Sequence, residues 1–201
     1  MNRTAPIHIL LFLMVLFSSF ISRAQTYKQE KEERIRMEDM PRKALEELQP
    51  FIEKAGKVRF YHETDGTRHS YECKFQSKGQ IYSIEFSEDG KLEDVEVVVG
   101  IRELPDKTAT AITDYLGENF NRYIIRKIQK QFTSENGKTG AKEIIEKALE
   151  GMDGDLKIKY ELEVDGKQDR ILVSQEILFD HEGSFLQKRK IIRRQVDNML
   201  Y

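Results

Sequence analysis

The sequence contains a single cysteine, Cys73, and no tryptophan. One cysteine excludes an internal disulfide, whatever the redox state of the compartment in which the protein works. Cys73 alternates with Tyr71 and Phe75, a spacing that predicts a small apolar residue on the inward face of a strand. The alternative is a reactive thiol, but such thiols need an exposed and electropositive setting.

The chain also lacks a strong excess of charge of either sign. Its 201 residues include 33 basic and 35 acidic side chains, a balance that argues against nucleic-acid binding. No nucleophile elbow, zinc-protease helix motif, phosphate-binding loop or dinucleotide-binding glycine motif occurs. We therefore expect no catalytic residues and no cofactor, and we do not expect an enzyme. An enzyme of unrecognised type is the alternative, and it would need a pocket with perturbed carboxylates or histidine.

The one long apolar run lies near the N-terminus, from Ile7 to Ile21, and follows the positive charge of Arg3. The tripeptide Ser22-Arg23-Ala24 places small residues three and one positions before Gln25, a pattern that signal peptidase cleaves. The run is shorter than the roughly 20 apolar residues of a membrane-spanning helix. We therefore predict a cleavable signal peptide over residues 1–24 and a periplasmic or secreted protein with no stable membrane span. Removing it leaves 31 basic and 35 acidic residues.

Two stretches of the chain repeat the same order of patterns. Helical patterns begin after Met40-Pro41 and after Leu104-Pro105, and proline suits the first turn of a helix. Further on, residues 84–92 align with residues 177–185, and each stretch contains a turn that ends in glycine. We interpret this as a duplication, with a first unit at 37–100 and a second at 101–201. Residues 25–36 form a charged lead-in, expected to be loose or an extra helical turn.

Each unit predicts one helix followed by antiparallel strands. In the first unit, apolar spacing predicts a helix over 40–52 and strands around 58–62, 71–75 and 82–86. Turns are expected at Asp65-Gly66 and Asp89-Gly90. The second unit predicts a strand at 160–164, a turn at Asp165-Gly166 and a strand over 171–179. A helix is inserted near 139–151. Residues 123–132 fit either a helix or a strand, and the repeat alignment favours the strand.

These patterns resemble the PepSY-like periplasmic proteins of Bacteroidetes, whose fold is similar to that of the β-lactamase inhibitory protein. The resemblance rests on the Met-Pro or Leu-Pro helix starts, the strands at 71–75 and 82–86, and Glu88-Asp89-Gly90. It covers residues 40–99 well and 104–192 more loosely, and the inserted helix departs from it. It implies an α+β fold: a tandem duplication of a helix-plus-antiparallel-strands unit, with the strands joined in one curved sheet and the helices packed on one face. It implies a link to peptidase inhibition or regulation, and no catalytic residues.

The function expected first is an exported, non-catalytic binding module that holds an envelope protein or peptide on its sheet face. Tyr61, Lys74 and Arg189 are candidate residues of that face. Glu93, Asp94 and Glu96 are acidic. The corresponding residues are Leu186, Gln187 and Arg189, and Arg189 belongs to a basic run at 188–194. A face with two opposite charges would orient a protein partner, and the basic run could instead touch anionic lipid. Two ordinary solvated strands are the simpler interpretation.

A small-ligand or metal-responsive module is the alternative function. His62 and His69 flank the turn at Asp65-Gly66, so a hairpin would bring the two imidazoles close together. No third ligand is evident from the spacing, and structural zinc sites usually have four, so the sequence assigns no metal site. His181 lies in a turn.

Acidic residues also cluster on two predicted strands and in the turns expected after them. Paired-carboxylate chemistry needs a concave site and perturbed pKa values, and calcium loops need a regular acidic spacing that is absent here. Because these acids alternate with apolar residues, the sequence favours a solvated sheet face. The residues concerned are Glu85, Glu88, Asp89, Glu161, Glu163 and Asp165.

Overall fold

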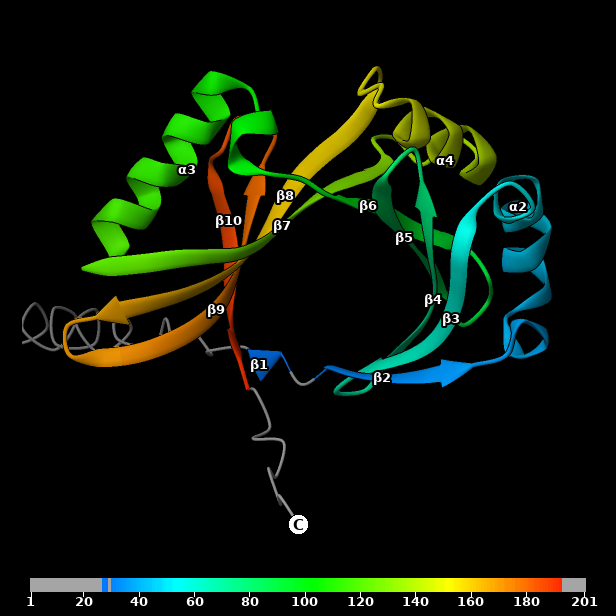
Figure 1. Cartoon of the computed structure of the whole chain (residues 1–201), viewed down its shortest axis with the longest axis horizontal. Helices are drawn as coiled ribbons and strands as arrows, with labels where there is room; N and C mark the ends of the chain where they lie inside the picture. Colours follow the sequence, from blue (N-terminus) through cyan, green and yellow to red (C-terminus); the bar gives the residue numbers. More distant parts are fainter. Residues whose placement is uncertain (1–26, 29, 193–201) are drawn as a thin grey trace, which may run out of the picture.

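A computed structural model describes residues 27–28 and 30–192 of the chain. Ten strands form one mixed sheet, in the order β1-β10-β9-β8-β7-β6-β5-β4-β3-β2. The sheet curls into a nearly closed barrel, and helices α2, α3 and α4 lie outside it (Figure 1). The elements of the described residues are β1 (Tyr27–Lys28), β2 (Glu30–Ile35), η1 (Met37–Asp39), α2 (Arg42–Ile52), β3 (Gly56–Asp65), β4 (Arg68–Ser77), β5 (Gln80–Ser87), β6 (Leu92–Val98), η2 (Ile101–Glu103), α3 (Asp106–Asn119), β7 (Arg122–Ser134), α4 (Ala141–Glu150), β8 (Leu156–Gln168), β9 (Ile171–Asp180) and β10 (Phe185–Ile191).

The N-terminal strands β1 and β2 close the barrel. They stand at opposite ends of the strand order, yet only one residue separates them in the sequence. β1 pairs in parallel with β10, whereas β2 pairs antiparallel with β3. Five of the six residues of β2 are exposed. Backbone hydrogen bonds and charged side chains, rather than apolar burial, therefore hold this segment in place.

The predicted fold class was wrong. Two helix-plus-strand units with their helices packed on one face were expected, whereas the structure is mainly one ten-stranded sheet that nearly closes on itself. The lead-in at 25–36 was expected to be loose or to form an extra helical turn. Its described residues instead form strands β1 and β2, which are followed by η1. A run of charges hides β2 from a search for alternating apolar residues, because Ile35 is the one residue of β2 that packs against the apolar core.

Several local predictions were right and one turn was wrong. The inserted helix is α4, and residues 123–132 belong to strand β7 as the repeat alignment favoured. The expected turn at Asp165-Gly166 lies instead inside β8, and the chain turns after Gln168. Asp169 has a φ of 55° and takes the left-handed position in this turn. Gly166 marks a close contact, because a Cβ there would lie 2.1 Å from Cδ1 of Phe120.

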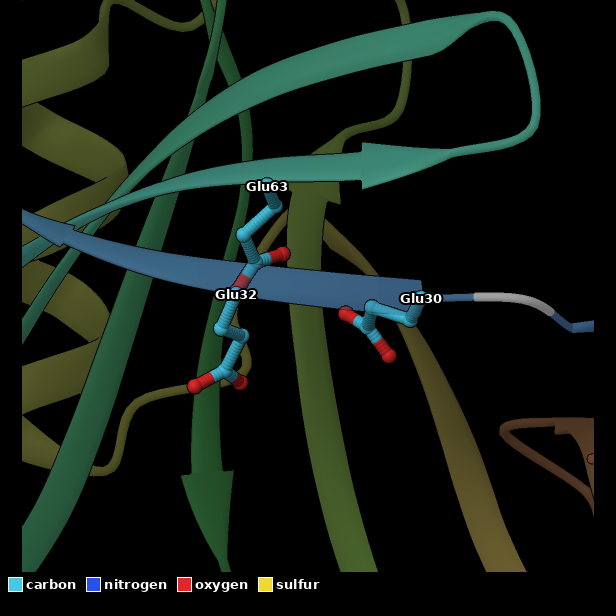
Figure 2. A group of neighbouring side chains, drawn as sticks. All are labelled: Glu30, Glu32 and Glu63. Carbon is cyan, nitrogen blue, oxygen red and sulfur yellow. The ribbon is translucent and has the colours of Figure 1, made fainter. Parts of the chain in front are cut away.

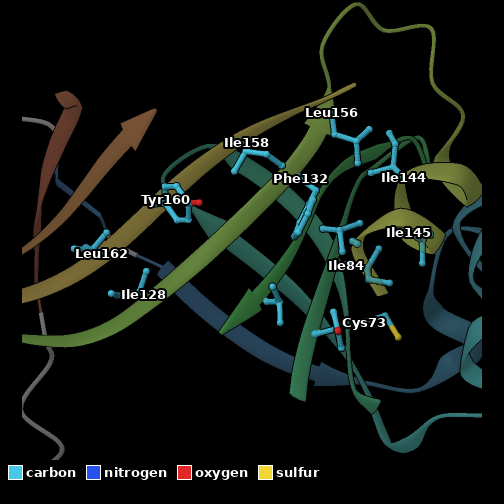
Figure 3. Close-up of a cluster of buried hydrophobic side chains, with 14 of the residues drawn as sticks. Cys73, Ile84, Ile128, Phe132, Ile144, Ile145, Leu156, Ile158, Tyr160 and Leu162 are labelled. Atoms are coloured by element: carbon cyan, nitrogen blue, oxygen red, sulfur yellow. The ribbon is translucent and has the colours of Figure 1, made fainter. Parts of the chain in front are cut away.

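The apolar core lies between the outer face of the sheet and the helices. Figure 3 shows Ile144 and Ile145 of α4 near Phe132 and Cys73 of the sheet, and all four side chains are buried. The prediction that Cys73 is a small core residue is confirmed. Burial, together with the nearby charge of Glu72, raises the pKa of the Cys73 thiol to about 12. The thiol therefore stays protonated and unreactive at neutral pH.

The opposite face of each strand points into the barrel. Side chains alternate between the two faces of a strand, so the acidic and basic residues between the core positions are directed inward. This arrangement puts apolar side chains outside the sheet, under the helices, and polar side chains inside it. None of the helices in the described part of the chain has the length and apolar character of a membrane span.

Candidate functional site

The inside of the barrel encloses a cavity of about 130 Å³, which we call the inner cavity. All of its lining residues are polar: nine are acidic, five are basic and three are neutral. Its volume corresponds to a few water molecules, at about 30 Å³ each. The lining residues are Lys28, Glu30, Glu32, Glu63, Asp65, Arg68, Ser70, Glu72, Lys74, Glu85, Asp94, Glu96, Lys127, Gln129, Gln131, Glu161 and Arg189.

The ammonium group of Lys74 lies among carboxyl groups contributed by β2, β3 and β4. Its Nζ lies 2.7 Å from Oε1 of Glu32, 2.8 Å from Oε2 of Glu72 and 4.0 Å from Oε1 of Glu63. Burial, and then the hydrogen bond and charge of Glu72, raise the pKa of Glu63 to about 11. Burial opposes ionisation of Glu72 too, but the hydrogen bond from Glu63 and the charge of Lys74 lower its pKa. Glu63 therefore holds the proton and Glu72 the charge.

Three of these carboxylates lie close enough together to share a cation. Oxygen atoms of Glu30, Glu32 and Glu63 are all within 4.8 Å of one another (Figure 2). The ammonium group of Lys74, however, already lies against Glu32 and Glu63. The positive charge that this cluster needs is thus supplied by the chain itself.

A second charged group links the two edges of the sheet. Nζ of Lys28 lies 2.5 Å from Oε2 of Glu176 and 3.7 Å from Oε1 of Glu161. Arg189 forms 2.5 Å ion pairs with Glu176 and with Asp65, and so joins β10 to β3. Burial and the charge of Glu176 raise the pKa of Glu161 well above its usual value. Burial opposes ionisation of Glu176 as well, but the charge and hydrogen bond of Lys28, the hydrogen bond from Glu161 and the charge of Arg189 together lower its pKa, so Glu176 stays ionised.

Acidic residues of β5 and β6 complete the cavity wall. Burial is the largest cause of the raised pKa values of Glu85, Asp94 and Glu96. Oδ1 of Asp94 is buried and has no hydrogen-bond partner among the described residues. The solvated-face interpretation was therefore wrong for Glu85 and Glu161, which line the inner cavity. The sequence could not reveal this, because alternation places a residue on a face without saying whether the face meets water.

Glu96→Gln is expected to stabilise the protein at pH 8 by about 2 kcal/mol and to leave its stability at pH 4 nearly unchanged. Burial raises the pKa of Glu96 from 4.5 to about 7, although the hydrogen bond from Gln131 opposes this. A raised carboxyl pKa gives stability that is fully present below pH 4.5 and is lost as the pH rises to about 7. Urea denaturation from pH 4 to 8 measures this, and parallel curves for the two proteins would contradict it.

A different surface projects from the end of the barrel. Strand β7 pairs with β8 from Arg122 to Ser134 but with β6 only from Gln129 to Phe132, and β9 pairs with β10 only from Gln175 onward. Residues 122–127, 163–168 and 171–174 therefore form a three-stranded extension, which we call the ribbon. Figure 1 shows it extending on the side of α3.

The ribbon exposes large apolar side chains beside positive charge. Leu172 is 83% exposed and Ile124 is 55% exposed. The strand register places Arg122, Lys167 and Leu172 in one row across one face, with Ile124 in the next row. These residues line an open groove of about 970 Å³.

Arg122 and Lys167 lie directly opposite each other in the ribbon. Like charges in this position destabilise a sheet, and neither residue forms an ion pair with the described residues. The carboxylate of Asp165, which lies nearby, accepts hydrogen bonds from Arg126 and from Ser174, each at 2.7 Å. The ribbon therefore carries positive charge that the described protein does not neutralise.

The residues singled out in the sequence lie in three places. Lys74 and Arg189 line the inner cavity, and Nζ of Lys74 lies 5.0 Å from the ring centre of Tyr61. The expected contact between His62 and His69 is confirmed, with ring centres 5.4 Å apart. His181 lies in the turn before β10, and its backbone carbonyl accepts a hydrogen bond from the hydroxyl of Thr108 at 2.9 Å. The ribbon was not predicted from the sequence, because the turn expected at Asp165-Gly166 placed the end of this strand too early.

The fold and sites thus define a ten-stranded barrel with a charged interior and a partly apolar ribbon. No family model and no curated protein matches the chain. Solved structures similar to it include a DUF2874 family protein from Bacteroides ovatus, with 12% identity, coverage of 75% of this chain and 86% of that one, and a TM-score of 0.49. A protein from Bacteroides eggerthii described as periplasmic has 12% identity, 75% and 88% coverage and a TM-score of 0.49. A BLIP-like protein from Bacteroides fragilis has 12% identity, 79% and 90% coverage and a TM-score of 0.46.

These descriptions match the resemblance to BLIP-like periplasmic proteins of Bacteroidetes that the sequence indicated. The PepSY-like assignment stays a prediction. So does the signal peptide, which lies outside the described residues.

Proposed function

We propose that the protein is an exported, non-catalytic binding module that holds an envelope protein or peptide on the ribbon. The observation that carries this proposal is the exposure of Leu172 and Ile124 on one face of a projecting sheet. Exposed apolar patches with polar rims are typical of protein interaction sites. Export itself rests on the N-terminal sequence pattern.

The ribbon suits a macromolecular partner better than the inner cavity does. The cavity measures about 130 Å³ and its wall consists of ion pairs and carboxylates within a nearly closed sheet. A folded protein needs roughly 800 Å² of accessible surface on each side of a stable interface. In the described part of the chain, the inner face of the sheet opens to a partner where it continues beyond the barrel, on the ribbon.

Charge complementarity points to a partner segment that combines apolar and acidic side chains. Arg122 and Lys167 repel each other across the ribbon, and a carboxylate bound between them would remove that repulsion. Leu172 offers an apolar contact in the same row. The expected partner is therefore an envelope protein that presents an extended acidic and apolar segment.

The double substitution Ile124→Asp with Leu172→Asp is expected to weaken binding of the partner at least tenfold. Interface hot spots typically contribute 2 kcal/mol or more each, and a buried new carboxylate adds a penalty. The measurement is quantitative cross-linking to envelope proteins in cells that export the full chain. Ile81→Asp is a matched control, because Ile81 is 56% exposed on β5, outside the ribbon.

The charge-reversal pair Arg122→Glu with Lys167→Glu separates electrostatic from apolar recognition. It should weaken the same cross-links, and raising the salt concentration should weaken those of the wild type. If the same proteins cross-link equally to the wild type and to both double variants, the ribbon is not the binding surface. Cross-linking only to a second copy of the chain would also overturn the proposed partner.

A further inference from the structure

Two imidazoles stack on the outer face of the β3–β4 hairpin. The rings of His62 and His69 have centres 5.4 Å apart and planes inclined by 10°. Both side chains lie on the outer face of the sheet, because His62 follows Phe60 and His69 precedes Tyr71 at two-residue spacing. His69 is exposed and His62 half-buried. The hairpin backbone fixes their separation, since the two strands pair continuously from Arg59 to Asp65.

Their separation suits a shared metal ion. With metal–nitrogen bonds of about 2.1 Å and near-tetrahedral angles, two coordinating imidazoles have ring centres roughly 5 Å apart. The observed 5.4 Å is close to that value. Rotation of the exposed His69 ring about its side-chain bonds would direct one nitrogen from each imidazole toward a common point.

Glu33 supplies a carboxylate on the same face. It lies directly opposite His62 in the β2–β3 register. Its present partner is Lys31, and both side chains are more than half exposed. Exchanging an exposed ion pair for a metal bond costs little, because such pairs contribute between 0 and about 1 kcal/mol. Tyr71 packs 5.1 Å from the His62 ring and limits movement on the other side.

We propose that His62, His69 and Glu33 form a surface site for a divalent transition-metal ion, such as Zn²⁺, Cu²⁺ or Ni²⁺. Imidazole nitrogen with one carboxylate is a ligand set that these ions accept, whereas calcium and magnesium prefer oxygen ligands alone. Water molecules complete the coordination. The site lies on the outer face of the sheet, whereas the carboxylates of the inner cavity are on the inner face, and it is independent of the ribbon.

The test is isothermal titration of Zn²⁺ into the full exported protein, without a polyhistidine tag, at pH 7.5. We expect one ion per chain. His62→Ala and His69→Ala should each weaken binding tenfold or more, and Glu33→Gln should weaken it less. His181→Ala is the matched control and should leave the affinity unchanged, because His181 lies in the turn before β10. Circular dichroism of each variant confirms that it is folded.

Two further readouts separate this site from non-specific binding. Lowering the pH from 7.5 to 5.5 should weaken binding strongly, because only an imidazole without its second proton can bind a metal ion. Bound Cu²⁺ should show nitrogen hyperfine coupling in its electron paramagnetic resonance spectrum, and the His62→Ala/His69→Ala double variant should lose it. The proposal is wrong if the wild type binds no Zn²⁺ saturably, or if the double variant binds it with unchanged affinity and stoichiometry.

Discussion

Gly166→Ala is expected to lower the free energy of unfolding by about 3 kcal/mol, the upper part of the usual range for overpacking a core. A Cβ at this position would lie 2.1 Å from Cδ1 and 2.5 Å from Cε1 of Phe120. Phe120 is 5% exposed and follows directly after α3, so its ring has little room to move away. The added methyl group must therefore displace either the strand or the end of the helix.

Gly117→Ala is the matched control for this substitution. Gly117 lies inside α3, is exposed, and nothing stands within 4 Å of its added Cβ. Alanine in a helix interior is more favourable than glycine by about 0.5 to 1 kcal/mol, so this variant should be slightly more stable than the wild type. Urea denaturation of both variants gives the two free energies. A Gly166→Ala protein within 0.5 kcal/mol of the wild type would show that the ring of Phe120 is not fixed there.

The same glycine explains why the ribbon was missed in the sequence. An Asp-Gly pair between alternating apolar residues predicts a hairpin turn, and at Asp65-Gly66 the prediction was right. At Asp165-Gly166 the strand continues, because glycine is needed there for the aromatic ring that packs on it. The two pairs are identical in the sequence. Only the tertiary contact distinguishes them.

Local patterns were sufficient for most helices and strands. The prolines at the starts of α2 and α3 and the alternation along β4 predict elements that need only their own residues. The closure of the barrel depends instead on pairs that are far apart, such as Lys28 with Glu176, which are 148 residues apart. Nothing in either local sequence identifies the partner.

The side chains that line the inner cavity could not be predicted from the sequence, for a related reason. Alternation correctly separates Ile84 from Glu85, since the first is in the core and the second is on the other face. Whether that second face meets solvent depends on how strongly the sheet curls and on strands β1 and β2, which lie at its two edges. The proximity of His62 and His69, by contrast, follows from one hairpin and could be predicted.

Lys28→Met is expected to lower the free energy of unfolding at pH 8 by about 3 to 5 kcal/mol, the usual cost of leaving a buried charge without its partner. The side chain of Glu176 is 3% exposed and lies 2.5 Å from the lysine ammonium group, and Glu161 lies 3.7 Å away. Methionine retains most of the apolar volume, so the charge is the main thing removed. Arg189 remains as a partner of Glu176, which places the effect nearer the lower figure.

Lys31→Met is the control, because Lys31 and its partner Glu33 are both more than half exposed. Pairs of this kind contribute between 0 and about 1 kcal/mol. The double variant Lys28→Met with Glu176→Gln should recover part of the loss, since it also removes the buried charge that Lys28→Met leaves without its partner.

The pH dependence decides whether the charge of Lys28 is the cause of the loss. In the wild type, chiefly the charge of Lys28 lowers the pKa of Glu176, against the effect of burial. A lowered carboxyl pKa gives stability that is present above the unfolded value of 4.5 and is lost as the pH falls through the folded value. The difference between wild type and variant should therefore be large at pH 8 and shrink below pH 4. An equal loss at both pH values would mean that β1 closes the barrel by backbone pairing and packing, and that its ion pairs are incidental.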